Sequence, residues 1–198
     1  MRHPLSIRLL HLALIAGVAV QLFTSEFMKA PRPGRVLTEW QLGTFVVHDR
    51  IGLVVLGTLA AMVLRLAAMR RPGGLRHVLP WTAAAGRTSL RRELAGRGAR
   101  PLEGAARLFT VARAVQGAGL ALLLVLGATG WAMHGPLSRG EPLEGVLRLV
   151  REVHESAGDL LWVWLGVHAA MALPALLSGR TAVLDVFRFG RRDGPSHS

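Results

Sequence analysis

The chain has 198 residues, of which 51% are hydrophobic and 18% are charged, with a mean hydropathy of +0.38 and a formal net charge of +12. A water-soluble domain carries about a quarter charged residues and only short apolar runs, so this composition excludes a typical soluble enzyme. The sequence contains no cysteine, which excludes disulfides, iron–sulfur clusters, cysteine-ligated zinc and covalently attached c-type haem. Any bound metal or cofactor must therefore be held by histidine, methionine or carboxylate side chains.

Four apolar segments follow one another along the chain, each close to the ~20 residues that a helix needs to cross about 30 Å of hydrocarbon. They are residues 5–23, 46–69, 111–133 and 154–177. Lipid offers no hydrogen-bond partner to the backbone, and polarity does not alternate along these segments, so helices are expected and a barrel is not. The sequence therefore predicts an all-α integral membrane protein, a four-transmembrane-helix bundle with a single domain over residues 1–198.

The first segment also resembles the apolar part of a signal peptide, because Arg2 and Arg8 precede or open it. It is about 19 residues long, contains a histidine and is followed by no small-x-small cleavage motif, so we expect it to be retained.

The distribution of basic residues predicts the orientation. Fifteen arginines lie in the N-terminal region, the 70–110 connection and the 178–198 tail, whereas six lysines and arginines lie in the other two loops. By the positive-inside rule, both termini and the 70–110 loop are expected to be cytoplasmic. Topology and anionic membrane lipid account for the net charge, so nucleic acid is not an expected partner. The 70–110 loop contains several glycines and prolines and is expected to be interfacial or partly disordered.

Four of the eight histidines lie within or at the ends of apolar segments, where ionisable residues are costly and usually mark a site. They are His11, His48, His154 and His168. The first and last lie toward the cytoplasmic side and the other two toward the outer side. The 154–168 interval spans about 21 Å and nearly four whole helical turns, so its two histidines share one helix face. The remaining histidines are expected to be solvated or interfacial, without a special role: His3, His77, His134 and His197.

Two pairs result, His48 with His154 outside and His11 with His168 inside. Two imidazoles facing each other from different helices can occupy both axial positions of a haem b iron. The chemistry left to such a haem is outer-sphere electron transfer, and two haems at two depths form a path across the bilayer. A single zinc or copper site is the alternative, but the two pairs lie about four helical turns apart, too far for one ion.

Several neighbours are candidates for contacts with the haems. Gly52 and Gly158 each follow a candidate ligand by four residues and leave room for the macrocycle, although ordinary helix packing also explains them. Arg50 and Arg151 on the outer side are candidates for contacts with haem propionates, with snorkelling to lipid headgroups as the alternative. Asp159 is a candidate for proton relay or for pairing with an arginine. On the inner side, the arginines that are candidates for contacts with haem propionates are Arg8, Arg65 and Arg113.

These residues resemble the bacterial cytochrome b561 family, which also includes the b-type membrane subunits of nickel–iron hydrogenases and formate dehydrogenases. The matching stretches are Arg8-Leu9-Leu10-His11, His48-Asp49-Arg50-Ile51-Gly52, Thr129-Gly130-Trp131 and His154 through His168. The resemblance implies a di-haem b cytochrome of the bacterial inner membrane that exchanges electrons with the quinone pool. It also implies that His48 and His154 bind the periplasmic haem and that His11 and His168 bind the cytoplasmic one. The arginine-rich 70–110 loop and the short basic tail depart from the family's pattern.

The sequence therefore predicts a di-haem b-type cytochrome that transfers electrons between quinone or quinol and a redox protein partner. The alternative is a cytochrome b membrane-anchor subunit of a hydrogenase- or dehydrogenase-type complex. A cofactor-free membrane scaffold or transporter is a remote alternative, which predicts no Soret band.

Overall fold

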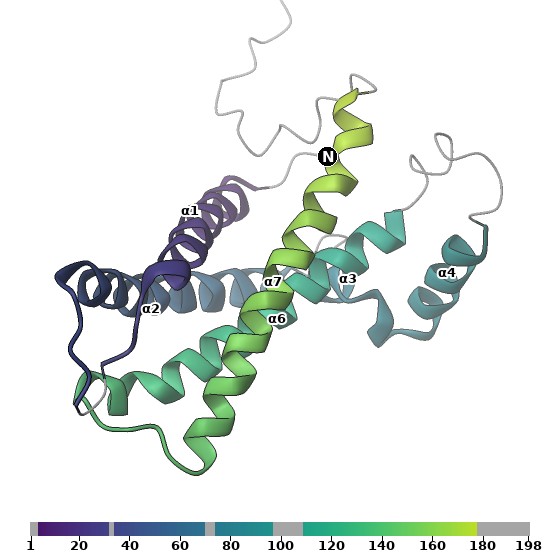
Figure 1. Cartoon of the computed structure of the whole chain (residues 1–198). Helices are drawn as coiled ribbons and strands as arrows, with labels where there is room; N and C mark the ends of the chain where they lie inside the picture. Colours follow the sequence, from purple (N-terminus) through teal and green to yellow (C-terminus); the bar gives the residue numbers. More distant parts are fainter. Residues whose placement is uncertain (1–3, 32–33, 70–73, 97–108, 178–198) are drawn as a thin grey trace, which may run out of the picture.

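The computed structural model describes residues 4–31, 34–69, 74–96 and 109–177, and over these residues its regular structure is helical (Figure 1). Each predicted apolar segment lies within one long helix, apart from Met69, which is the C-cap of the second long helix. The expected all-α class is confirmed for this part of the chain. The long helices are α1 (Leu5–Phe27), α2 (Glu39–Ala68), α6 (Phe109–Ser138) and α7 (Val146–Leu177).

Helices α2 and α7 begin seven and eight residues before the apolar segments they contain. A capping box starts α2: the Thr38 hydroxyl accepts a hydrogen bond from the Gln41 backbone N–H at 3.2 Å, and the Gln41 side chain accepts one from the Thr38 N–H at 3.3 Å. The first turns of α7 carry the exposed ion pair of Arg148 with Glu152, at 3.3 Å. Hydropathy detects only the apolar part of a helix, whereas these polar turns continue the same backbone hydrogen bonding.

The long helices are those of a membrane protein. Within the described residues, α1, α2 and α6 are long and apolar enough to cross a membrane. In α7, residues 160–177 include no Asp, Glu, Lys or Arg. Large apolar side chains are also exposed, with 62% of Val54, 70% of Leu64 and 64% of Val163 accessible. Apolar surface of this kind suits contact with lipid, where helices satisfy their own backbone groups.

The helices pack as two pairs, α1 with α2 and α6 with α7, and the pairs are joined through α2 and α6 (Figure 1). Small residues allow the close approach: a Cβ on Gly127 of α6 would lie 2.8 Å from Leu56 of α2. The buried core cluster comes from α1 and α2 and consists of Leu14, Leu59, Met62 and Leu66.

Part of the 70–110 connection is ordered. Residues 74–96 form α3 (Leu75–Val78), the 3-10 turn η1 (Pro80–Thr82) and α4 (Ala84–Ala95), and these elements contact α6. Trp81 covers Gly117 of α6, where a Cβ would lie 2.6 Å from the indole ring. The loop was expected to be interfacial or partly disordered, and in residues 74–96 the structure shows short helices packed against α6. Residues 70–73 and 97–108 lie outside the described residues.

Glu93 links α4 to the start of α6. Its carboxylate accepts hydrogen bonds from the backbone N–H groups of Thr110 at 2.9 Å and Val111 at 3.0 Å. The first N–H groups of a helix have no partner within the helix, and the positive end of its dipole favours an anion. The side chain therefore serves as an N-terminal cap provided from another helix.

We expect Glu93→Ala to lower the free energy of unfolding by about 1–2 kcal/mol, because two helix N–H groups lose a charged acceptor. Thermal unfolding in detergent, followed by circular dichroism, measures the change. Arg91→Ala, an exposed neighbour on the same helix, is the matched control and should have little effect. Equal stability of the Glu93 variant and the control would contradict the capping role.

Candidate functional site

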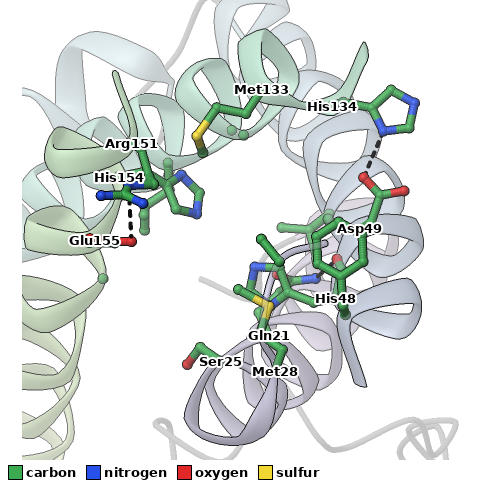
Figure 2. A pocket seen from close by; sticks show the side chains of 18 of the residues that line it. Gln21, Ser25, Met28, His48, Asp49, Met133, His134, Arg151, His154 and Glu155 are labelled. Atoms are coloured by element: carbon green, nitrogen blue, oxygen red, sulfur yellow. Dashed lines mark hydrogen bonds and ion pairs between the residues drawn. The ribbon is translucent and has the colours of Figure 1, made fainter. Parts of the chain in front are cut away.

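A cavity of about 640 Å³ opens between the C-terminal halves of α1 and α6 and the N-terminal halves of α2 and α7. This volume is within the range of small-molecule and cofactor pockets, roughly 300–1,000 Å³. Apolar side chains, including Leu22, Phe45 and Leu59, form much of its wall. His48 and His154 face this space from α2 and α7 (Figure 2).

The structure brings His48 and His154 together, with ring centroids 6.4 Å apart and ring planes at 77°. An imidazole nitrogen binds a metal at about 2.0–2.1 Å and lies about 1.1 Å from its ring centre, so two rings on opposite sides of one ion have centroids about 6.3 Å apart. The separation of the two rings is therefore compatible with both rings binding one metal ion placed between them.

Each of the two rings is hydrogen-bonded through Nδ1 to a threonine of the neighbouring helix. Thr24 Oγ1 lies 3.0 Å from His48 Nδ1, and Thr129 Oγ1 lies 2.8 Å from His154 Nδ1. Each hydroxyl also donates to the backbone carbonyl four residues earlier in its own helix, at 2.8 and 2.7 Å. Because the single hydroxyl proton can go to that carbonyl, these contacts allow the tautomer in which the imidazole Nδ1 donates to the threonine oxygen. The lone pair of each neutral ring is then on Nε2, which can bind a metal.

This donor set suits haem rather than a bare metal ion. Nowhere in residues 4–31, 34–69, 74–96 and 109–177 do three His, Asp or Glu side chains gather as ligands of a metal ion. A zinc or copper site normally needs three or four protein ligands, whereas a haem iron takes four from the porphyrin and needs at most two from the protein. Two imidazoles with Nε2 lone pairs provide those two.

The two predicted glycines line the cavity but differ in their surroundings. A Cβ on Gly158 would meet nothing within 4 Å, so the space beside α7 one turn after His154 is open. A Cβ on Gly52 would lie 3.6 Å from the amide of Gln21, which donates a hydrogen bond to the His48 backbone carbonyl at 2.7 Å. The expected room for a flat ring is thus present at Gly158, while Gln21 lies beside Gly52.

The outer arginines also differ. Arg151 lines the cavity, with its Nε 3.5 Å from a Glu155 carboxylate oxygen (Figure 2). Arg50 is exposed and is not among the residues that line the cavity. It follows His48 by two positions, about 200° around the helix, and so lies on the opposite side of α2. Asp159 is exposed at the cavity edge. Two basic residues besides Arg151, Lys29 and Arg35, are also exposed there.

Asp49 and His134 form a polar contact that the sequence analysis missed. His134 Nδ1 lies 2.6 Å from an Asp49 carboxylate oxygen, and both side chains line the cavity (Figure 2). The His134 ring also stacks on Trp131, with centroids 6.1 Å apart. His134 was expected to have no special role, and its sequence position beside a glycine and a proline gave no signal of this contact. The contacts of Thr24 and Thr129 with the histidines were not predicted either, because each threonine lies 24 or 25 residues from its histidine in the sequence.

His168 lies on the far part of α7 and is oriented by Trp164. The two rings stack with centroids 4.8 Å apart, and the Trp164 indole N–H donates to the Val115 carbonyl of α6 at 2.7 Å. The indole lies directly against Gly119, where a Cβ would overlap the ring. His11 is half-buried on α1, which packs mainly against α2. The pairing of His11 with His168 stays a prediction.

We expect Gly119→Ala to displace the rigid Trp164 ring and to cost roughly 1–3 kcal/mol of stability, as overpacking does. Near-ultraviolet circular dichroism reports the tryptophan environment, and thermal unfolding in detergent reports the stability. Gly166→Ala is the matched control, because a Cβ at Gly166 of α7 would meet nothing within 4 Å. An unchanged tryptophan signal in the Gly119 variant would show that the indole does not depend on this glycine.

A family model described as "Prokaryotic cytochrome b561" matches residues 2–188, nearly the whole chain. No curated protein and no solved structure matches the chain significantly. The family match confirms the resemblance carried by the histidine-containing sequence motifs.

Proposed function

The chain belongs to the prokaryotic cytochrome b561 family, a family of membrane b-type cytochromes that act in electron transfer, and on this premise we propose that it is a di-haem cytochrome. Its proposed role is to move electrons between the quinone pool and a redox protein partner in the bacterial inner membrane. The observation that supports it best is the His48 and His154 pair, whose ring centroids are 6.4 Å apart beside a cavity.

In this proposal, His48 and His154 are the axial ligands of one haem b. Haem b bound there supplies one-electron oxidation and reduction. The two imidazoles hold the iron through Nε2, and the apolar cavity wall limits the access of water. Gly158 leaves space beside the macrocycle, while Arg151, with Lys29 and Arg35 at the cavity edge, is a candidate to neutralise the propionates.

His11 and His168 are the proposed ligands of a second haem, about four helical turns from the first along α7. Trp164, whose indole N–H donates to the Val115 carbonyl, stacks on one face of the His168 ring. If these four histidines hold the two haems, the irons would supply electron transfer, and a substrate would have to displace a histidine to bind iron. The proposal therefore assigns the protein electron transfer and no residue that acts chemically on a substrate.

The proposed arrangement in the membrane uses all four long helices as spans, with α7 as the fourth. Both termini and the 70–110 connection then lie on the cytoplasmic side, as the positive-inside rule predicts. The His48 and His154 site lies toward the periplasm, and the second site lies toward the cytoplasm. Electrons entering at one surface can then reach the other through two sites in one chain.

We expect two haems per purified chain, and one haem each in His154→Ala and His168→Ala, because each substitution removes one axial ligand. Reduced-minus-oxidised spectra with haem quantification by the pyridine haemochrome method measure the stoichiometry. His197→Ala, in the C-terminal tail, is the control and should keep both haems. Addition of a quinol to the wild-type protein should reduce haem.

Colourless wild-type protein would contradict the proposed cofactor and favour a cofactor-free membrane scaffold or transporter. An unchanged haem count in both histidine variants would contradict the pairs. Isolation of the chain only with a larger dehydrogenase subunit, without quinol-dependent reduction of the chain alone, would favour the membrane-anchor alternative over a freestanding quinone-linked cytochrome.

We also expect Gly158→Leu to fold but to bind less haem at the first site, because leucine fills open space in the cavity. Gly57→Leu is the matched control: a Cβ at Gly57 of α2 also meets nothing within 4 Å, and Gly57 does not line the cavity. Both substitutions gain about 1 kcal/mol of helix propensity, so any difference comes from the cavity. Equal haem content in the two variants, measured spectroscopically at equal protein concentration, would show that the cavity beside Gly158 is not the haem site.

A further inference from the structure

The axial histidines of the first site share one structural device that the electron-transfer proposal does not need. On α1, Thr24 contacts His48 of α2, and on α6, Thr129 contacts His154 of α7. The two contacts come from separate helix pairs, yet they have the same donor, the same acceptor and the same threonine hydroxyl bond to its own helix. Thr24 is only 4% exposed. Two unrelated helix pairs that repeat one contact point to a function of that contact.

We propose that Thr24 and Thr129 are positioning residues that set the ring orientation and the electron donation of the two axial imidazoles, and thereby the midpoint potential of the first haem. The inference rests on the proposed function, in which His48 and His154 bind that haem. The hydroxyls act through the imidazoles and not by contact with the iron.

The binding of Nε2 to iron in the proposed site sets the direction of each hydrogen bond. In the proposed site Nε2 binds the iron, so Nδ1 keeps its proton and would donate to the threonine oxygen, while the threonine hydroxyl donates to its helix carbonyl. This bond fixes the tautomer and stops free rotation of the ring about its Cβ–Cγ bond. For a metal-bound histidine, a hydrogen bond from the second ring nitrogen also raises the basicity of the ligating nitrogen.

The chemistry of the hydrogen-bond acceptor affects the potential of the haem. A more basic imidazole stabilises ferric iron more than ferrous iron, so each threonine should lower the potential of the haem it supports. A neutral hydroxyl accepts a weaker hydrogen bond than a carboxylate, because charge-assisted bonds are about twice as strong. Asp49 lies next to His48 in the chain, but its carboxylate contacts His134. The ring of His48 therefore contacts a neutral hydroxyl and no carboxylate of Asp49, and the ring of His154 also contacts a neutral hydroxyl.

Each ring contacts a threonine hydroxyl and also interacts with the backbone of the residue three positions before that threonine, Gln21 for His48 and Leu126 for His154. Gln21, also on α1, holds the His48 backbone carbonyl at 2.7 Å, so one helix restrains both the backbone and the ring of this histidine. Gly130 lies beside the His154 ring, where a Cβ would be 3.4 Å from Cε1. Removal of a hydroxyl alone therefore tests the hydrogen bond with little change in packing.

The test uses Thr24→Val and Thr129→Val, which keep the side-chain shape and remove the hydroxyl. Each should weaken the preference of one haem for the ferric state by about threefold to tenfold, which is an upward shift of roughly 30 to 60 mV for a one-electron couple. Spectroelectrochemical titration of the complete haem-loaded protein measures both potentials. The low-spin ferric signal in electron paramagnetic resonance should shift in the same variants, because the rings rotate more freely.

The controls separate the hydrogen bond from a general loss of structure. Thr44→Val removes an equally buried hydroxyl, 5% exposed, which donates to the Trp40 carbonyl in the same helix as His48. It should leave both potentials unchanged. Thr24→Ser and Thr129→Ser keep a hydroxyl and should restore the wild-type potential. Because both threonines act on the same haem, the double valine variant should shift that one potential further and leave the other haem unchanged.

Unchanged potentials and spectra in both valine variants would overturn the inference, and so would an equal shift in Thr44→Val or a failure of serine to restore the potential. If one valine variant does not retain haem, the other makes the same test, because both should move the same potential in the same direction. Wild-type protein without haem would instead refute the proposed function, so the two failures are distinguishable.

Discussion

The hydrogen bond from an imidazole Nδ1–H to a threonine hydroxyl is the interaction on which the candidate site depends. A polar ring inside a membrane helix bundle needs a partner for its N–H, because lipid supplies none. Thr24 and Thr129 meet this need on Nδ1 of the two rings, and both histidines line the cavity. In the proposed function, the same contacts would leave Nε2 of each ring available to the haem iron.

The order of helix packing makes this arrangement possible. Each ligand helix pairs with the helix that provides its threonine, α2 with α1 and α7 with α6, and contact between α2 and α6 brings the two pairs together. Gly127 allows that contact to be close, since a larger residue would meet Leu56. At the other end of α6, Glu93 and Trp81 dock the connecting segment on its first turns. In the part of the chain that the structure describes, few residues are buried, and the helices contact one another at small residues and helix ends.

The surroundings of individual site residues show which contacts the spacing along a helix predicts and which it does not. Arg50 was a candidate because it lies at nearly the same level as His48. Residues two positions apart on a helix lie on opposite sides of it, however, and the cavity is lined by Asp49 and Gly52 instead. Gly52 and Gly158 hold the same position relative to a histidine, yet Gln21 from α1 lies beside only the first. Such differences arise from the neighbouring helix and have no counterpart in local sequence.

The sequence by itself determined the helical class and the four apolar segments, because hydropathy and a fixed rise per residue act locally along the chain, whereas the depth of each histidine stays a prediction. It also indicated that His48 and His154 lie at one level. The tertiary structure alone decided which side chains meet: the threonine partners of the rings, the bond of Asp49 to His134 and the docking of residues 74–96 on α6. These contacts join residues far apart in sequence, and their geometry depends on how each helix is rotated about its axis, which only packing against its neighbours fixes.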